Sequence, residues 1–280
     1  MKVRDGEREY PSWLEFEQSG YRTIVGRYVG QFGSARPIAK VDCDDSGRFH
    51  FAIPPQWERQ TNDVVFDGKL DGEILRGTTA NDQGKTIPWE GRRAPALQQA
   101  QEPKWGKPIK LFNGRDLSGW KARNATAKHG WRVEAGGLTN AVPGNDLVSE
   151  QLFTDFKLRA KFRYPKGSNS GIYLRGRYEV QIEDNFGQEP GSHYIGGVYG
   201  FLTPRVNASR PAGEWQTLEI TLVGRVVTVV LNGQPIIERQ AIPGITGGAL
   251  DSNEEQPGPI MIQGDHGPIE FAELIITPAK

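Results

Sequence analysis

Apolar and polar residues alternate in short segments through the first third of the chain. Alternation with a period of two is the pattern of a strand with one buried face. Asp45-Ser46-Gly47 and Leu70-Asp71-Gly72 separate such segments and are typical of tight hairpin turns. We therefore predict a small antiparallel β-domain over residues 1–93. Its expected strands are Trp13–Glu17, Arg22–Val29, Arg48–Ile53, Val64–Leu70 and Glu73–Thr79.

Residues 94–107 break this pattern. The window Ala94–Glu102 has helix-friendly residues, but it lacks apolar side chains at helical spacing. Pro103 and Pro108 follow it and would end a helix. We interpret residues 94–107 as a linker between two domains, with room for a single helical turn.

Longer alternating segments follow in residues 108–280. Asn232-Gly233 stands between two of them and is a strong signal for a type I′ hairpin turn. Long antiparallel strands with one apolar face need a second sheet to cover that face. The expected fold is therefore all-β, with a β-sandwich after the small antiparallel domain. The sandwich strands expected are Phe156–Tyr164, Trp215–Leu222, Val226–Leu231 and Pro235–Ile237.

The charge of the chain excludes some classes of partner. Lysine and arginine together number 34, as do aspartate and glutamate, so the net charge at pH 7 is zero. Without a positive field or a basic run, binding to nucleic acid or to an acidic membrane is not expected. No segment is long and apolar enough to predict a membrane span. The first nine residues lack the apolar core of a signal peptide, and the single cysteine, Cys43, excludes an internal disulfide.

The segment from Gly171 to Asp184 carries the densest candidate chemistry. Interpreted as one strand, it has apolar side chains at even positions and polar side chains at odd positions, on opposite faces. The odd face gathers Tyr, Arg, Glu and Gln, whereas a solvated face would favour Lys and Thr. We favour a ligand-binding face, although a solvated face also fits the alternation. The polar positions are Tyr173, Arg175, Arg177, Glu179, Gln181 and Glu183.

Five motifs between residues 109 and 277 resemble the 3-keto-disaccharide hydrolase family, and they occur in the family's order. The resemblance implies a concanavalin A-like jelly-roll β-sandwich, a carbohydrate ligand, and export to the periplasm or surface of a bacterium. Glu183 departs from the family, which usually has an aliphatic residue there, and Gly264 is an extra residue before Asp265-His266. The matching motifs are Leu111–Trp120, Ser168–Gly176, Tyr178–Ile182, Val206–Trp215 and Ile262–Gly267.

The pattern Glu179-x-Gln181-x-Glu183 imitates the paired glutamates of a glucanase of this fold. Two positions along a strand separate side chains by about 7 Å, and four positions by about 13 Å. A retaining glycosidase needs its carboxyl groups about 5–5.5 Å apart, and an inverting one about 6.5–9.5 Å. Glu179 and Glu183 are too far apart for either without a bulge, and Gln181 cannot be the nucleophile. Glucanase-like hydrolysis is therefore the weaker hypothesis.

The family resemblance implies a chemistry that needs one base. A ketone at C3 of a glycoside acidifies the proton on C2, because the carbanion becomes an enolate. A base that removes this proton can expel the substituent at C1, and water adds afterwards. Glu179 and His266 are the candidate bases, and Arg175 is the candidate electrophile for the enolate oxygen. The candidate substrate-binding residues are Tyr173, Gln181, Glu183, Gln263 and, from a loop, His193.

Three functions are left open by the sequence. The first is cleavage of 3-keto-glycosides by proton abstraction at C2. The second is a carbohydrate-binding module without turnover, because the same fold binds sugars without cleaving them. The third is a glucanase-like glycoside hydrolase. In the first, a divalent cation could take the role of Arg175, with Asp184, Asp265 and His266 as its ligands.

Overall fold

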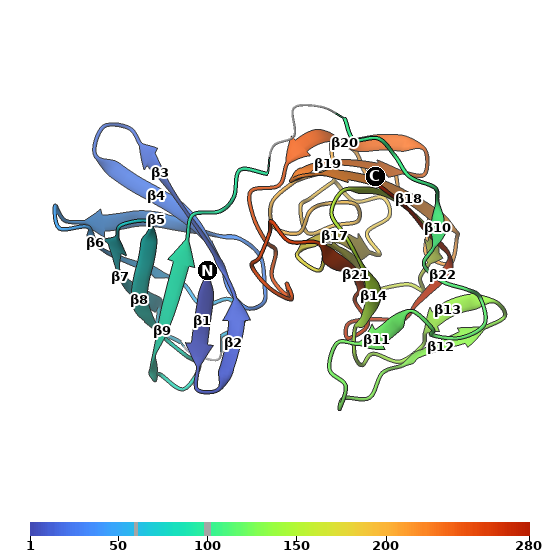
Figure 1. Ribbon diagram of the computed structural model, residues 1–280, viewed down its shortest axis with the longest axis horizontal. Coiled ribbons are helices and arrows are strands. Elements are labelled where there is room, and N and C mark those ends of the chain that lie inside the picture. The colour runs from blue at the N-terminus through green and yellow to red at the C-terminus, as the bar shows by residue number, and fades with distance from the viewer. Residues whose placement is uncertain (59–60, 98–101) are drawn as a thin grey trace. The chain divides into compact units, whose positions relative to one another are not determined.

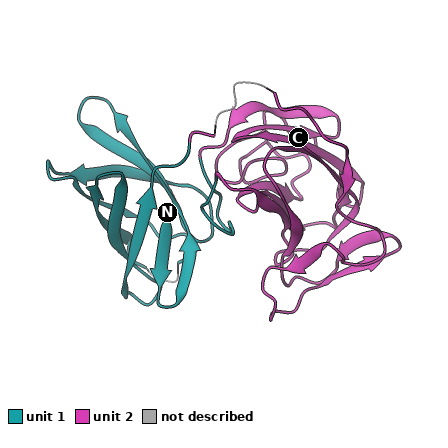
Figure 2. Cartoon of the chain, in the orientation of Figure 1, with its two compact units in different colours: residues 1–95, 244–254 teal, residues 96–243, 255–280 magenta. Residues whose placement is uncertain are grey.

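The computed structural model has two compact units, both built from β-strands (Figure 1, Figure 2). The residues it describes are 1–58, 61–97 and 102–280. The first unit consists of residues 1–95 and 244–254, and the second of residues 96–243 and 255–280. None of the described residues forms a helix that is long and apolar enough to span a membrane.

Two details of this division differ from the sequence analysis. Residues 244–254 pack within the first unit, where the Gly248 N–H donates to the Gln31 carbonyl at 2.8 Å. Residues 98–101 of the expected linker lie outside the described residues, so the helical turn is not tested there. The chain already belongs to the second unit from Ala96, and Trp105 forms a β-bridge with Ala279.

The first unit contains one antiparallel sheet. Its strands are β1 (Lys2–Asp5), β2 (Arg8–Pro11), β3 (Trp13–Ser19), β4 (Thr23–Val29), β5 (Arg36–Cys43), β6 (Arg48–Ile53), β7 (Val64–Asp71), β8 (Ile74–Ala80) and β9 (Thr86–Arg92). The nine strands lie in the order β2-β1-β9-β8-β7-β6-β5-β4-β3. The predicted small antiparallel domain is therefore confirmed. Its core combines aliphatic side chains with the aromatic rings of Tyr28, Phe49, Phe51, Phe66 and Trp89.

The second unit is a sandwich of two antiparallel sheets. Its strands are β10 (Ile109–Lys110), β11 (Trp120–Ala122), β12 (Trp131–Glu134), β13 (Gly137–Asn140), β14 (Leu147–Phe153), β15 (Phe156–Arg163), β16 (Asn169–Leu174), β17 (Tyr178–Glu183), β18 (Gln216–Val223), β19 (Val226–Leu231), β20 (Gln234–Ala241), β21 (Gly258–Ile262) and β22 (Ile269–Pro278). The larger sheet has the order β12-β13-β22-β15-β18-β19-β20, with β10 beside β22. The smaller has the order β11-β14-β21-β16-β17 and lies inside the curve of the larger (Figure 1). The all-β, concanavalin A-like sandwich is confirmed.

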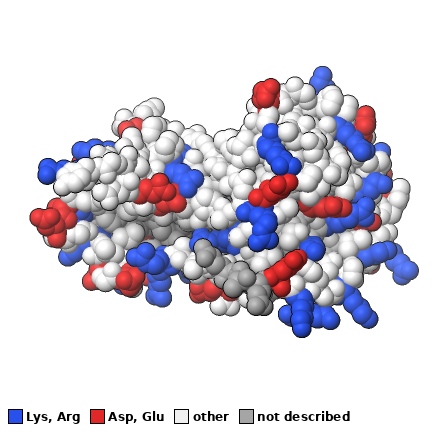
Figure 3. Space-filling view, turned by 90° about the horizontal axis from the view of Figure 1, so that it is seen from above, with Lys and Arg blue, Asp and Glu red and all other residues white. Residues whose placement is uncertain are grey.

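The face of β15 that carries Lys157, Arg159, Lys161 and Arg163 is a solvated outer face. Arg159 pairs with Glu273 and Arg163 with Glu270, both across to β22 at 2.6 Å. Exposed pairs of this kind each contribute about 0–1 kcal/mol to stability. On the face of the molecule seen in Figure 3, positive and negative side chains are interspersed over each unit, as a net charge of zero leads one to expect.

Residues 171–184 do not form a single strand, and that prediction is wrong. They contribute to β16 and β17, an antiparallel hairpin whose turn has positive φ at Arg175 (53°) and Gly176 (66°). The register sets Tyr173 opposite Glu179, and every pair of partners shares the same parity. Residues directly opposite in a sheet lie on the same face, so the odd-numbered side chains stay together through the turn. The alternation of polar and apolar residues therefore gives no sign of the turn.

Candidate functional site

The hairpin register gathers the odd-numbered side chains on one face of the smaller sheet. Tyr173 lies opposite Glu179, and Gly171 lies opposite Gln181. On the other edge of β16, the Gln263 N–H donates to the Gly171 carbonyl at 2.9 Å. Gln181 and Gln263 thus flank Gly171, each one strand spacing of about 4.8 Å away. The structure thus brings together four of the predicted site residues around Gly171: Tyr173, Glu179, Gln181 and Gln263.

Glu179 is the central group of this cluster. Its side chain is buried, with only 3% of the residue exposed, and Oε2 accepts a hydrogen bond of 2.9 Å from the Tyr173 hydroxyl. The carboxylate lies over Gly171, where a Cβ would overlap Oε1. Burial raises the pKa of Glu179 to about 8, although the hydrogen bond from Tyr173 opposes this shift. A carboxylate with so high a pKa is a strong base once it is ionised.

Tyr173 acts as a donor to this carboxylate. Burial and the neighbouring charge of Glu179 raise the pKa of Tyr173 well above its ordinary value. The hydroxyl therefore keeps its proton at any physiological pH and can only donate to Glu179 when the carboxylate is ionised. This hydrogen bond holds the carboxylate in one orientation on the sheet.

A second carboxylate, Asp146, borders the cluster at the start of β14. Its side chain accepts a hydrogen bond of 2.9 Å from the Gly264 N–H and pairs with Arg123 at 3.1 Å. Burial raises the pKa of Asp146, and its negative charge in turn raises that of Glu179. β21 and β16 separate β14 from β17, so the two backbones are about 14 Å apart.

His266 supplies positive charge near Glu179. Its Nδ1–H donates to Asp265, and this hydrogen bond raises the pKa of the imidazole. The charge of His266 lowers the pKa of Glu179, which shows that the two groups are electrostatically coupled. His266 is about half-exposed, and its raised pKa increases the protonated fraction of the imidazole, so it suits the role of a cation better than that of a base.

Two amide oxygens in the cluster lack protein partners. Gln181 and Gln263 are buried, and within the described part of the chain neither Oε1 accepts a hydrogen bond. A buried polar atom left unsatisfied costs about 1–3 kcal/mol. Oxygens of this kind on either side of Gly171 are suited to accept hydrogen bonds from the hydroxyl groups of a ligand.

The segment after β17 extends the sheet beyond its last strand. The Gln181 N–H donates to the Gly197 carbonyl at 2.9 Å, and the Tyr199 N–H donates to the Glu179 carbonyl at 3.0 Å. Tyr199 therefore lies beside Glu179, and its ring meets the ring of His193 edge to face at 5.1 Å. The predicted loop residue His193 is exposed, and it contacts Tyr199 rather than Glu179 itself.

Arg175 is not brought to the cluster. It is 1% exposed, and its guanidinium lies over the Tyr178 ring and donates to the Gly224 carbonyl at 2.6 Å. Tyr178 belongs to the apolar face of β17, opposite to the face of Glu179. Arg175 therefore stabilises the hairpin turn, and we do not retain it as the electrophile for the enolate.

Glu183 lies on the same face as Glu179 but at the far end of β17. It is opposite Asn169 in an unbroken register, so the separation of about 13 Å that was expected for the two glutamates stands. Asp184 accepts a hydrogen bond from the Gly167 N–H at 2.8 Å. Within the described ranges, no three His, Cys, Asp or Glu side chains are placed to hold a metal ion, so Asp184, Asp265 and His266 do not fit as a ligand set.

Comparison with known proteins identifies the class. Residues 107–277 match the model of the 3-keto-alpha-glucoside-1,2-lyase-like domain. The chain belongs to this family. A crystal structure of a predicted glycosyl hydrolase from Parabacteroides distasonis ATCC 8503 is 29% identical, with a TM-score of 0.50 over 60% of this chain and 82% of that one. A second from the same organism is 20% identical, with a TM-score of 0.52 over 62% and 94%, and shares the fold. No curated protein gave a match.

The 3-keto-alpha-glucoside-1,2-lyase-like domain accounts for the second unit, and the predicted family resemblance is confirmed. The protein is therefore carbohydrate-active, of a glycosyl hydrolase-like family. Every member of the Glu179 cluster lies within the matched residues, whereas residues 1–95 lie outside them. The sequence analysis missed Gly171, Asp146 and Tyr199. For Gly171 a signal existed, because glycine inside a strand often marks the close approach of another group.

Proposed function

We propose that the second unit cleaves 3-keto-glycosides by removing the proton from C2, with Glu179 as the base. The buried carboxylate of Glu179, held by Tyr173 over Gly171, carries this proposal. Its pKa of about 8 suits proton abstraction from carbon near neutral pH, because a general base works best when its pKa is close to the working pH. Glu183 is too distant to serve as the second carboxylate of a glycosidase pair.

Glu179, His266 and one water molecule account for every proton that the reaction moves. Ionised Glu179 takes the C2 proton, and the electrons of that C–H bond move into the enolate with the C3 oxygen. The enolate then reforms the ketone and expels the C1 oxygen, which leaves with the electrons of its bond. That oxygen takes a proton from Glu179 or from His266. Water adds to the resulting C1–C2 double bond, which returns the 3-keto-sugar.

The remaining residues bind and polarise the substrate. Protonated His266 is the cation that would stabilise the enolate oxygen, in the role first expected of Arg175. The amide oxygens of Gln181 and Gln263 would accept hydrogen bonds from the sugar hydroxyls. Tyr199 and the exposed His193 would contact the ring or its substituent from the side of the loop. Each of these roles follows from position relative to Glu179.

The decisive experiment compares a glycoside before and after oxidation at C3. We expect release of the C1 substituent from methyl or nitrophenyl 3-keto-glucosides and no release from the parent glucosides, because only the ketone makes the C2 proton acidic. Sugar release is followed by chromatography or by nitrophenolate absorbance. Equal turnover of both forms would exclude the mechanism. Binding of both without turnover would leave a carbohydrate-binding module as the function.

Gly171→Ala tests the position of the carboxylate. The added Cβ overlaps Oε1 of Glu179, and the flexible carboxylate would have to move away. Displacement of a catalytic group by about 1 Å costs on the order of 10²-fold in rate, so we expect a loss of about that size with the fold retained by circular dichroism. Gly137→Ala is the matched control, because its Cβ would meet the Glu270 carboxylate at 3.2 Å, away from the cluster. An unchanged rate in Gly171→Ala would contradict the placement.

A further inference from the structure

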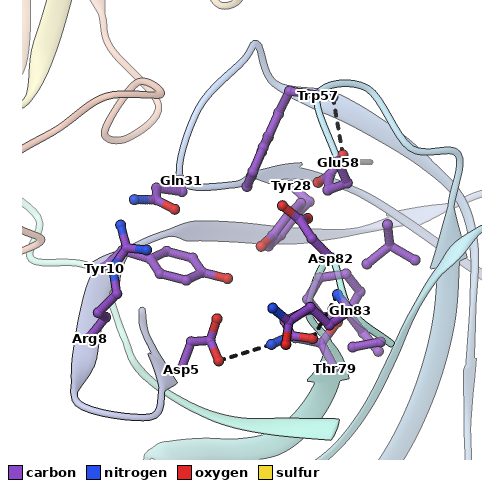
Figure 4. Close-up of a pocket in the computed structure, with 14 residues that line it drawn as sticks. Asp5, Arg8, Tyr10, Tyr28, Gln31, Trp57, Glu58, Thr79, Asp82 and Gln83 are labelled. Carbon is purple, nitrogen blue, oxygen red and sulfur yellow. Dashed lines mark hydrogen bonds between the residues drawn. The ribbon is translucent and has the colours of Figure 1, made fainter. Parts of the chain in front are cut away.

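A cavity of about 200 Å³ opens in the first unit, in the part of the chain that the family does not cover (Figure 4). Tyr10, Tyr28 and Trp57 supply its aromatic wall. The cavity is smaller than the roughly 300–1,000 Å³ typical of sites for drug-sized ligands. The polar side chains that line it are Asp5, Arg8, Gln31, Asn81, Asp82 and Gln83.

Hydrogen bonds and ring contacts hold the Trp57 side of the aromatic wall in place. Glu58 accepts hydrogen bonds from the backbone N–H groups of Gln56 (2.8 Å) and Trp57 (3.3 Å). Trp57 packs against the backbone of Gly33, where a Cβ would approach its ring within 3.0 Å, and meets the Phe32 ring edge to face. A wall that is already ordered loses little entropy when a ligand binds.

Charge in the cavity is largely balanced. Arg36 pairs with both oxygens of Glu58, at 2.7 and 3.1 Å, and both side chains are buried. The Arg36 guanidinium also covers the Tyr28 ring, so that ring face is not available to a bound cation. Two carboxylates and Arg8 then remain along the walls. This mixture favours neither a strong anion nor a quaternary ammonium ion.

Hydrogen-bonding groups of both kinds face the same space. Asp5 accepts a hydrogen bond from the Asn81 amide at 3.0 Å, which fixes its carboxylate. Figure 4 shows the Tyr10 hydroxyl and the Asp5 carboxylate pointing into one space below Trp57. Carboxylates accept from hydroxyl groups, amides accept and donate, and Arg8 donates. A neutral molecule with many hydroxyls and an apolar C–H face matches these walls and the aromatic rings.

We propose that this cavity binds a single neutral sugar residue, which makes the first unit a carbohydrate-binding module. The volume admits about one ring rather than a chain, so the ligand is the end or a branch of a glycan. The site is separate from the Glu179 cluster and does not depend on the function proposed for the second unit. It would hold the protein on a glycan whether or not the second unit cleaves a glycoside.

The test uses the full-length chain and four probes, the methyl glycosides of glucose, galactose, mannose and xylose. Saturation-transfer NMR and calorimetry measure their binding. We expect at least one to bind saturably, and Asp82→Ala and Tyr10→Ala to weaken it by about tenfold or more, as the loss of a good hydrogen bond or ring contact would. Asp82 is exposed at the rim, so its variant keeps the fold even if Tyr10→Ala does not.

Two controls separate this site from others. Tyr21→Ala removes a tyrosine that is 86% exposed and outside the cavity, and Glu150→Gln alters an exposed carboxylate of the second unit. Both should leave glycoside binding unchanged. The proposal is overturned if no probe binds, if Asp82→Ala and Tyr10→Ala both bind as the parent does, if Gln181→Ala in the second unit abolishes binding, or if choline displaces the sugar.

Discussion

Glu179→Gln should lower the rate of 3-keto-glycoside cleavage by about 10²–10⁴, the usual contribution of a general base. The amide keeps the size of the side chain and can still accept the hydrogen bond from the Tyr173 hydroxyl, but it cannot take a proton from C2. Substrate binding should change little, because Gln181 and Gln263 are untouched. The measurement is kcat and KM on a 3-keto-glucoside, and the loss should lie in kcat.

The pH dependence of the parent protein should identify the same group. In the proposed mechanism only ionised Glu179 abstracts the proton, so kcat/KM should rise with pH as its buried carboxyl group, with a pKa of about 8, ionises, and should fall again where His266 loses its proton. An exposed carboxylate would have given its plateau several pH units lower. Glu150→Gln is the control, because Glu150 is an exposed carboxylate on the same sheet. If Glu179→Gln kept a kcat close to that of the parent, another residue would be the base.

The strands with clear alternation could be predicted because alternation is a local property. Trp13–Glu17, Val64–Leu70 and Val226–Leu231 all lie within observed strands, and Asn232-Gly233 forms its turn with φ of 51° and 83°. Among the strands that were not predicted are β1, β2, β5 and β9 of the first unit. They are short or interrupted by polar residues, and the register of the sheet rather than their own pattern places them.

The polar face of the site could also be predicted, but not its turn or its neighbours. Parity put Tyr173, Glu179 and Gln181 on one face, and the hairpin preserves parity. The same argument placed Arg175 with them, because periodicity alone does not distinguish a strand residue from a turn residue of equal parity. Asp146 and Tyr199 come from distant parts of the chain, and only the tertiary structure brings the charge of Asp146 and the side chain of Tyr199 to Glu179.

Glu179→Gln should also stabilise the second unit at alkaline pH. Glu179 has an ordinary pKa of 4.5 in an unfolded chain and a pKa of about 8 in the folded protein. Below 4.5 both states hold the proton, and the carboxyl group adds no pH dependence. Between the two values the unfolded chain has lost its proton and the folded protein has not, so the free energy of unfolding falls as pH rises.

Above pH 8 the full penalty of a buried charge is present. The difference of 8 minus 4.5 corresponds to a penalty on the order of 5 kcal/mol. The amide does not titrate, so we expect Glu179→Gln to have a free energy of unfolding higher than the parent by several kcal/mol at pH 8.5 and nearly equal at pH 4.5. Urea unfolding across this range measures it, with Glu150→Gln expected to follow the parent within about 0.5 kcal/mol. If the free energy of unfolding of the parent and of Glu179→Gln changed with pH in the same way, Glu179 would ionise normally. A buried carboxylate that destabilises the fold is retained only where ionisation of the base is useful.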